Sequence, residues 1–359
     1  MAALRIHLHQ MSFWLCLWVA LPLSAQHTTW SVGTSLGYAL PHRSEMLALV
    51  TGHSREITCR IGNWNTTGWR QNWQQHGPVW QGIQAGWLNG GSEELGDMAS
   101  AMWLVELPVR RRWHIELGSG VGWSTSPYDP IERPLSIAIG SRLNAAIHLG
   151  TTVQVVQREQ SWVAVGAGFT HFSNGALALP NLGINNVHLR VRAGWKTPHR
   201  FPERTPAAWM DTTEGWHWAC AGRIGARDIN LPGGVLHPTV SVGAYAQRKA
   251  TATHSWVLAI DLAHNQSLRQ FSETPLSMPQ KLQLSSLAGV NLHFGHAQLM
   301  LLQGWVWTRP DEALGRVPFQ AILAYAVRPS WAIEMGLRSF RIRADYPFIG
   351  IRYSPRASR

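Results

Sequence analysis

The sequence predicts an all-β protein: an antiparallel transmembrane β-barrel of about 14 strands, within a range of 12 to 16. Three observations lead to this fold class. The chain is a succession of segments about ten residues long, many of which alternate apolar and polar residues. The connections between them alternate between tight turns and long loops. Twenty tryptophans occur in 359 residues, and tryptophan favours the interface between membrane and water.

The first 25 residues have the pattern of a secretory signal peptide. Arg5 gives a basic start, an apolar stretch follows over residues 11–23, and small residues precede an expected cleavage after Ala25. This apolar stretch is too short to span a bilayer. We therefore expect residues 26–359 to form a single outer-membrane β-barrel domain. Cys59 and Cys220 remain after export, and a disulfide between them is chemically possible but not indicated by their spacing.

The expected strands lie between glycine, proline, asparagine or aspartate residues, and helical periodicity is weak throughout. They cover residues 29–38, 79–88, 98–109, 113–123, 143–156, 161–170, 187–195, 216–227, 238–248, 255–264, 282–294, 297–308, 318–327, 331–339 and 347–353.

The lengths of the connections carry the topology. Tight turns occur at residues 109–113, 157–160, 295–296 and 327–330, and longer links at 124–140, 265–281 and 309–317. Turns at one end and loops at the other are typical of a transmembrane barrel. Two long links, residues 63–77 and 196–215, fall on the turn side and break this pattern. A soluble β-sandwich is the alternative fold.

The mature chain is basic. Removing the signal peptide leaves about 30 basic and 20 acidic residues, a net charge of roughly +10. Such a balance suits an anionic partner, either nucleic acid or a phosphorylated lipid surface. Alternatively, the arginines line a polar interior. Arg190, Arg192 and Arg223 stand in the polar rows of their strands, which favours a solvated lumen.

His171 and Ser173 are the most informative pair of residues. They stand two apart at the end of an alternating segment, so their side chains share one face of a strand. Val163, Val165 and Phe169 have the same parity, and in a barrel this apolar row faces lipid. A polar pair on the lipid face is costly unless it has partners or a task. A serine beside a histidine is the minimum for an activated oxygen nucleophile.

Asn185 belongs to the apolar row of the next expected strand and can meet His171 across the hairpin. Its amide can accept the imidazole N–H and hold the ring in the tautomer that takes the serine proton. Asn174, Asn181 and the backbone N–H of Gly175 are candidate donors to an oxyanion. The same pattern also fits a rim histidine that hydrogen-bonds a loop carbonyl.

Residues 170–185, with the sequence Thr-His-Phe-Ser-Asn-Gly-Ala-Leu-Ala-Leu-Pro-Asn-Leu-Gly-Ile-Asn, closely resemble the active-site segment of the lipid A 3-O-deacylase family. These proteins are outer-membrane barrels, and their relatives in Bacteroidetes-type bacteria are usually labelled acyloxyacyl hydrolases. Residues 62–68, 126–130, 140–147 and 343–353 are also similar to this group, so the resemblance extends over most of the mature chain.

The resemblance implies a serine esterase in the outer membrane whose substrate is the acylated lipid A of lipopolysaccharide. His171 matches the general base and Ser173 the nucleophile; Asn174, Gly175 and Asn181 fall in the region that stabilises the oxyanion. The family's best-known members carry Glu where this chain has Asn185. The chain is also about twice as long as the smallest members, which predicts a wider barrel. We expect no cofactor, no metal and no nucleic-acid partner.

Two other functions are open to the sequence alone. The first is a non-catalytic outer-membrane barrel, either porin-like or structural, which the missing acid at Asn185 favours. The second is a periplasmic domain that binds nucleic acid or glycan, which the positive charge favours.

Overall fold

The computed structural model describes residues 28–65, 68–195, 215–229, 234–271, 275–308, 315–341 and 343–355. The predicted signal peptide and nearly all of the link 196–215 lie outside these residues. Within them are sixteen strands and four short 3-10 helices. The strands are β1 (Thr28–Ala39), β2 (Ser54–Asn65), β3 (Val79–Asn89), β4 (Asp97–Arg110), β5 (Trp113–Ser124), β6 (Leu143–Gln157), β7 (Ser161–Ser173), β8 (Ile184–Trp195), β9 (His217–Arg227), β10 (His237–Lys249), β11 (His254–Asn265), β12 (Leu282–Phe294), β13 (Ala297–Val306), β14 (Pro318–Arg328), β15 (Trp331–Phe340) and β16 (Arg343–Tyr353). The helices are η2 (Ser44–Met46), η3 (Gly68–His76), η4 (Gln266–Phe271) and η5 (Pro279–Lys281).

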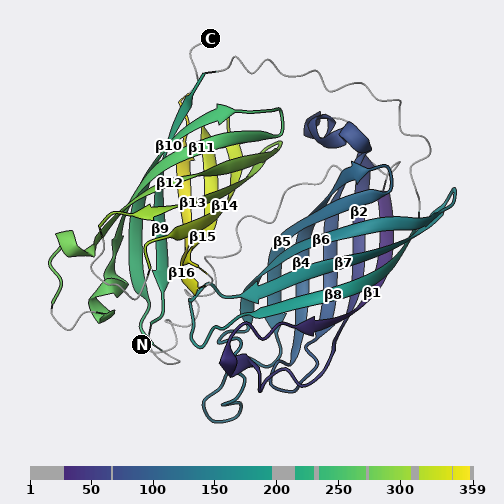
Figure 1. Cartoon of the computed structure of the whole chain (residues 1–359), viewed down its shortest axis with the longest axis horizontal. Coiled ribbons are helices and arrows are strands. Elements are labelled where there is room, and N and C mark those ends of the chain that lie inside the picture. The colour runs from purple at the N-terminus through teal and green to yellow at the C-terminus, as the bar shows by residue number, and fades with distance from the viewer. Residues whose placement is uncertain are drawn as a thin grey trace.

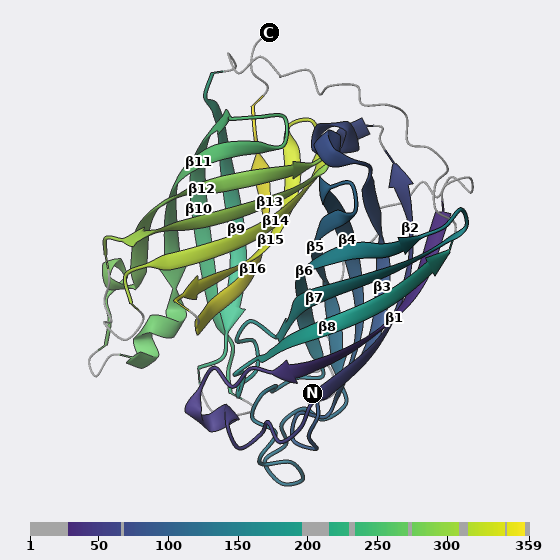
Figure 2. The same cartoon turned by 45° about the vertical axis from the view of Figure 1, so that its right-hand side comes forward.

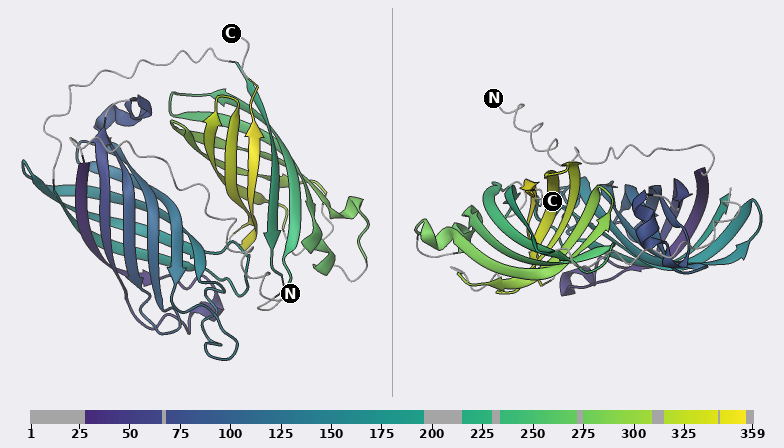
Figure 3. Two further views of the ribbon diagram at one scale, coloured as in Figure 1. Left: turned by 180° about the vertical axis from the view of Figure 1, so that it is seen from behind. Right: turned by 90° about the horizontal axis from the view of Figure 1, so that it is seen from above.

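The strands close into two separate barrels, β1–β8 and β9–β16 (Figure 1). In the first barrel β1 pairs with β8 in an antiparallel register that runs from Trp30 opposite Trp195 to Ala39 opposite Asn186. In the second barrel β9 pairs with β16 over six residues, from Gly225 opposite Phe348 to Cys220 opposite Tyr353. The two barrels stand side by side when the molecule is turned by 45° (Figure 2) and when it is seen from behind or from above (Figure 3).

The all-β antiparallel class is confirmed, but the expectation of one wide barrel of about 14 strands is wrong. Eight strands are enough for closure, because they enclose an interior that side chains alone can fill. Each of the fifteen expected segments corresponds to a strand. The sequence prediction missed β2, although it alternates clearly: Ile57 and Ile61 are exposed, whereas Thr58 and Arg60 are buried.

Both barrels have the same arrangement of connections. The tight connections β4–β5, β6–β7, β12–β13 and β14–β15 lie at one end of the strands, here called the turn end. The long connections lie at the opposite end, here called the loop end, which is the lower end in Figure 1. The helix η3, between β2 and β3, is a long connection at the turn end, as the sequence predicted for residues 63–77.

The outer walls of both barrels are apolar. Leu189 and Ile57 are 71% and 63% exposed, and outward rows of this kind recur on strands of both barrels. Exposed tryptophans gather at two levels, as in the aromatic girdles of outer-membrane barrels. Those near the turn end are Trp30, Trp113, Trp195, Trp216, Trp218, Trp256 and Trp331, and those near the loop end are Trp87, Trp123, Trp305 and Trp307. Among the described residues no helix is long and apolar enough to cross a membrane.

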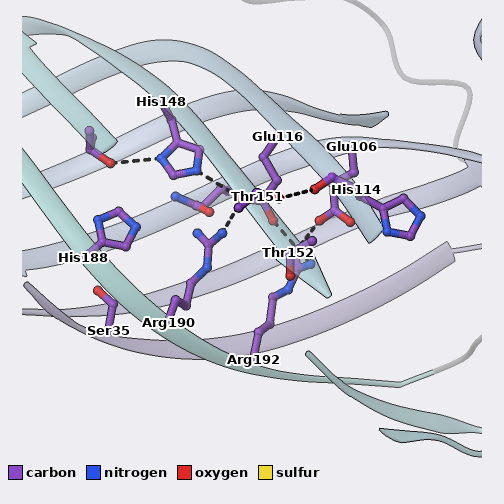
Figure 4. Close-up of polar contacts among 12 residues, drawn as sticks. Ser35, Glu106, His114, Glu116, His148, Thr151, Thr152, His188, Arg190 and Arg192 are labelled. Carbon is purple, nitrogen blue, oxygen red and sulfur yellow. Dashed lines mark hydrogen bonds and ion pairs between the residues drawn. The ribbon is translucent and has the colours of Figure 1, made fainter. Parts of the chain in front are cut away.

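The lumen of the first barrel is filled by an ion-pair network centred on Glu116 (Figure 4). Two guanidinium nitrogens of Arg60 lie 3.1 Å from the two Glu116 carboxylate oxygens, and His148 Nε2 also lies 3.1 Å from Oε2. Arg190 donates to the same carboxylate, and Arg192 binds Glu106. Because these charges are buried, each depends on its partners to offset the cost of leaving water.

A second network fills the lumen of the other barrel. Arg223 donates to Glu334 at 3.0 Å and to Asp261 at 3.1 Å. The buried Arg338 lies beside Asp345, with 3.6 Å between Nε and Oδ2. The prediction that Arg190, Arg192 and Arg223 point into a polar interior is therefore confirmed. They meet carboxylates there, so neither lumen has the open interior of a channel.

The two barrels contact each other at the turn end through η3. The indole N–H of Trp73 donates to the backbone carbonyl of His293 on β12 at 2.8 Å, and the Trp73 ring stacks on Phe294 with 5.1 Å between centroids. Cys59 and Cys220 stand on different barrels, and both are free and exposed.

We expect the substitution Glu116→Gln to destabilise the first barrel by about 3–5 kcal/mol, because it leaves buried guanidinium groups without their shared carboxylate. The free energy of unfolding in urea, measured on protein folded in lipid vesicles, tests this. Glu132→Gln is the matched control, since the carboxylate of Glu132 is 72% exposed in its pair with Arg133. Equal unfolding midpoints for the two variants would contradict the importance of the network.

Candidate functional site

The candidate site lies at the loop end of the first barrel, where β7 ends at Ser173 and β8 begins at Ile184. The register of these strands places His171 directly opposite Asn185. Burial along β7 gives the direction of the side chains: Trp162, Ala164, Thr170 and Phe172 are buried, whereas Val165 and Ala167 are exposed. His171 shares the parity of the exposed residues, so its side chain stands on the outer face of the barrel.

A short hydrogen bond joins His171 to Asn185. His171 Nδ1 and Asn185 Oδ1 are 2.6 Å apart. The amide oxygen can only accept, so Nδ1 carries the proton and the lone pair is left on Nε2. That is the tautomer in which an imidazole can act as a base towards a hydroxyl group.

Ser173 lies in a small cradle of donors. The backbone N–H of Gly175 donates to Ser173 Oγ at 3.1 Å, and the side-chain amide of Asn181 donates at 2.9 Å. Gly175 has a φ of +67°, a left-handed conformation that glycine adopts without strain. Both donors converge on the serine oxygen itself.

The side-chain amide of Asn174 makes its hydrogen bonds within the surrounding loops. Its amide oxygen accepts from the Ala176 N–H at 3.0 Å, and its amide nitrogen donates to the Ala178 carbonyl at 2.8 Å and to Ser141 Oγ at 3.0 Å. These bonds fold the chain between β7 and β8 into a compact loop. Of the three donors predicted, Gly175 and Asn181 contact Ser173, whereas the side chain of Asn174 builds the loop that presents them.

His171 and Ser173 are adjacent on the same face, but among the described residues no hydrogen bond joins them directly. The hydroxyl of Ser173 is engaged by Gly175 and Asn181 instead. In apo enzymes such catalytic contacts are often long and tighten only with substrate.

The loop between β5 and β6 covers the site from above the barrel. The Gly183 N–H, in the connection before β8, donates to the Ala138 carbonyl at 2.9 Å. Gly140 approaches the same connection so closely that a Cβ there would lie 2.6 Å from the Pro180 carbonyl oxygen. Farther along this loop, backbone N–H groups of Glu132 and Ile131 bind the Asp129 carboxylate and lower its pKa.

His42, which the sequence prediction missed, is the next member of the site. It follows β1, and its Nδ1 lies 2.9 Å from the amide nitrogen of Asn185. Its Nε2 lies 2.9 Å from the Leu182 carbonyl. Asn185 is thus held on one side by His171 and on the other by His42. No local pattern marks His42, because only the closure of β1 on β8 brings it to Asn185.

The second barrel also reaches this loop. The backbone N–H of Asp228, directly after β9, donates to the Ala176 carbonyl at 2.7 Å, and the Asp228 carboxylate accepts from the Leu179 N–H at 3.2 Å. On the other side of the loop, a Cβ at Gly175 would lie 3.2 Å from Pro347 on β16. The loop that carries Gly175 and Asn181 is therefore packed against the second barrel.

An apolar hollow lies on the outer wall next to His171, on the strands that carry the site. Its lining includes Leu36, Leu149, Phe169, Val187 and Leu189, from β1, β6, β7 and β8. Phe169 is two residues before His171 on the same face, and Val187 is two residues after Asn185. Among the described residues, no cluster of histidine, cysteine, aspartate and glutamate is arranged to hold a metal ion.

Comparison of the sequence with known protein families gives one match. Residues 56–194 match the family model described as Lipid A 3-O-deacylase (PagL). Over these residues the first barrel is therefore similar to the lipid A 3-O-deacylases. The match runs from the beginning of β2 almost to the end of β8 and confirms the resemblance over that part of the chain. The second barrel lies outside it, including residues 343–353, which the sequence alone had linked to the same family.

Several solved structures are similar to the chain over most of its length but share little sequence with it. They include Acinetobacter baumannii OccAB4, at 8% identity and a TM-score of 0.24, with 93% of this chain and 99% of that chain covered. A triple mutant of the Rhodopseudomonas blastica porin is 12% identical, with a TM-score of 0.22 and coverage of 91% and 99%. Such low scores carry no argument about function. No curated protein matches the chain.

We expect Asp228 to hold the oxyanion loop in place, because its carboxylate accepts from the Leu179 N–H. Asp228→Ala should lower the protection of amides in residues 174–182 by about tenfold or more in hydrogen–deuterium exchange, since bonds to charged acceptors are the stronger ones. Asp228→Asn, which keeps an acceptor oxygen, should lower it much less. Equal exchange in all three proteins would show that the Asp228 carboxylate does not hold the loop in place.

Proposed function

We propose that the protein is a serine ester hydrolase that removes an acyl chain from lipid A in the outer membrane. One observation carries the proposal: a histidine–serine pair stands on the apolar outer wall of a barrel, with a histidine-orienting amide and two oxyanion donors in contact with it. The match of residues 56–194 to the lipid A 3-O-deacylase family supports the same substrate.

The placement of the pair fits a substrate that stays in the membrane. Lipid A holds its ester bonds near the boundary between headgroup and acyl chains, and His171 and Ser173 stand near the loop end, below the loops and above the apolar wall. An acyl chain can lie along the hollow lined by Phe169, Val187 and Leu189. Burial of apolar surface there gives roughly 25 cal/mol per Å² towards binding.

The chemistry follows from the contacts. His171 Nε2 takes the proton of the Ser173 hydroxyl as Oγ attacks the ester carbonyl. The carbonyl oxygen becomes an oxyanion and accepts hydrogen bonds from the backbone N–H of Gly175 and the side-chain amide of Asn181. The tetrahedral intermediate collapses to an acyl-enzyme, and the leaving alcohol receives the proton from His171. Water, deprotonated by the same imidazole, then attacks the acyl-enzyme; the bond to Ser173 Oγ breaks, the imidazolium returns the proton to Oγ, and the fatty acid is released.

A porin-like function receives less support. A conducting barrel needs a water-filled lumen, and small barrels of eight strands are filled by their side chains. In the first barrel that filling is the network around Glu116, and in the second it is the network around Glu334. A non-catalytic structural role would leave the converging contacts at Ser173 without a purpose.

We expect Ser173→Ala to abolish deacylation of lipid A. Mass spectrometry of lipid A from outer membranes with and without the protein measures this as the loss of one acyl chain. Ser161→Ala is the matched control, because Ser161 stands at the turn end of the same strand, away from the site. The proposal fails if the wild-type protein leaves every lipid A unchanged, or if Ser173→Ala remains active.

We expect Asn185→Asp to raise the turnover rate by about tenfold or more. A carboxylate stabilises the imidazolium that forms during attack, and removing that charge from a serine protease costs about 10⁴ in rate. Aspartate has nearly the same shape as asparagine, so the contact with His171 is retained. Initial rates on purified lipid A measure the effect, and a slower Asn185→Asp enzyme would contradict this account of the base.

A further inference from the structure

We infer that His42 is a positioning residue that fixes the orientation of the Asn185 amide and, through it, the tautomer of His171. The inference rests on the proposed function, since it explains how a base can be oriented in a site that has an amide where a carboxylate is expected. It is carried by three hydrogen bonds in series, from His171 to Asn185, from Asn185 to His42 and from His42 to Leu182.

A carboxylate and an amide differ in symmetry. Either oxygen of a carboxylate accepts the Nδ1–H of histidine, so a rotation of the group by 180° changes nothing. An amide has one acceptor end and one donor end. If Asn185 turned its NH₂ group towards His171, Nδ1 would have to accept, the proton would move to Nε2, and the imidazole could no longer take a proton from Ser173.

The contacts of His42 decide which way the amide faces. Its Nε2 lies 2.9 Å from the Leu182 carbonyl, which can only accept, so Nε2 carries the proton. In the neutral ring Nδ1 then has a lone pair, and it faces the Asn185 amide nitrogen at 2.9 Å. A second carbonyl, that of Leu40, lies farther from Nδ1 at 3.3 Å and cannot compete while Nδ1 has no proton.

The amide nitrogen of Asn185 therefore has a defined acceptor, and its oxygen is left for His171. The reversed amide would place its oxygen against the Nδ1 lone pair of His42 and its NH₂ group against His171. His42 contacts neither Ser173 nor the expected position of the ester, so its effect passes entirely through Asn185. His42 thus orients the Asn185 amide but adds no negative charge beside His171.

The tautomer of His171 is the direct test. The ¹⁵N shifts of histidine-labelled full-length protein in detergent micelles distinguish a protonated Nδ1 from a protonated Nε2, with His171 assigned by its loss in His171→Ala. We expect the Nδ1–H form in the wild type. In His42→Ala we expect a mixture of tautomers or the Nε2–H form. His296→Ala, a histidine exposed on the second barrel, is the control and should leave the His171 signals unchanged.

The deacylation rate gives a second test, measured both in the wild-type background and in an Asn185→Asp background. His42→Ala should lower kcat by about 3- to 10-fold, the range for one hydrogen bond that selects between two orientations, with little change in KM. In an Asn185→Asp background the same substitution should cost less than about twofold, because the carboxylate needs no orientation. A merely structural role for His42 would give equal losses in both backgrounds.

The outcomes separate the two proposals. If His171 keeps the Nδ1–H form in His42→Ala, the inference is wrong, whatever the activity. If the wild type has no deacylase activity but its His171 tautomer depends on His42, the proposed function fails and the positioning role stands. Should His42→Ala not fold, His42→Leu retains volume without an acceptor and gives the same two measurements.

Discussion

The hydrogen bonding of β1 to β8 is the constraint on which the other features of this protein depend. It closes the first barrel after eight strands, so that the remaining strands must close on one another in a second barrel. Eight strands enclose a lumen that is only wide enough for side chains. The polar row of every strand must then find partners inside, which it does as ion pairs around Glu116. The same closure brings His42, at the end of β1, against Asn185, at the beginning of β8.

A filled lumen also determines where chemistry can take place. Glu106, Glu116 and three arginines pair inside the first barrel, whereas His171 lies on the opposite, outer face of its strand. His171 and Ser173 have the outward parity of β7, and Ser173 is buried beneath the loop that follows it. Under the proposed function this face of the barrel meets the acyl chains of a membrane, where water has limited access and hydrogen bonds are stronger than in bulk solvent. An ester inside the membrane is the substrate that we propose for this position.

The alternation of apolar and polar residues along each strand made most of the strands, and the face on which each side chain lies, predictable from the sequence. Parity alone placed His171 and Ser173 outside and Arg190 and Arg192 inside, because side chains change face at every residue. Closure was not predictable from alternation, since it depends on which strand β8 meets. The one local indication was the long link at residues 196–215 on the turn side, which separates β8 from β9. His42 and Asp228 were missed for the same reason: both reach the site through pairing between distant parts of the chain.

The second barrel repeats the architecture of the first, but among the described residues it has no equivalent of the loop between β7 and β8. Its last two strands, β15 and β16, occupy the place that β7 and β8 hold in the first barrel, yet only residues 341 and 342 connect them. The ten residues between Ser173 and Ile184 supply Gly175 and Asn181 in the first barrel. What the second barrel offers instead is Asp228 and Pro347, which touch the loop of the first. The first barrel thus carries the groups that we propose to react, and the second packs against the loop that holds them.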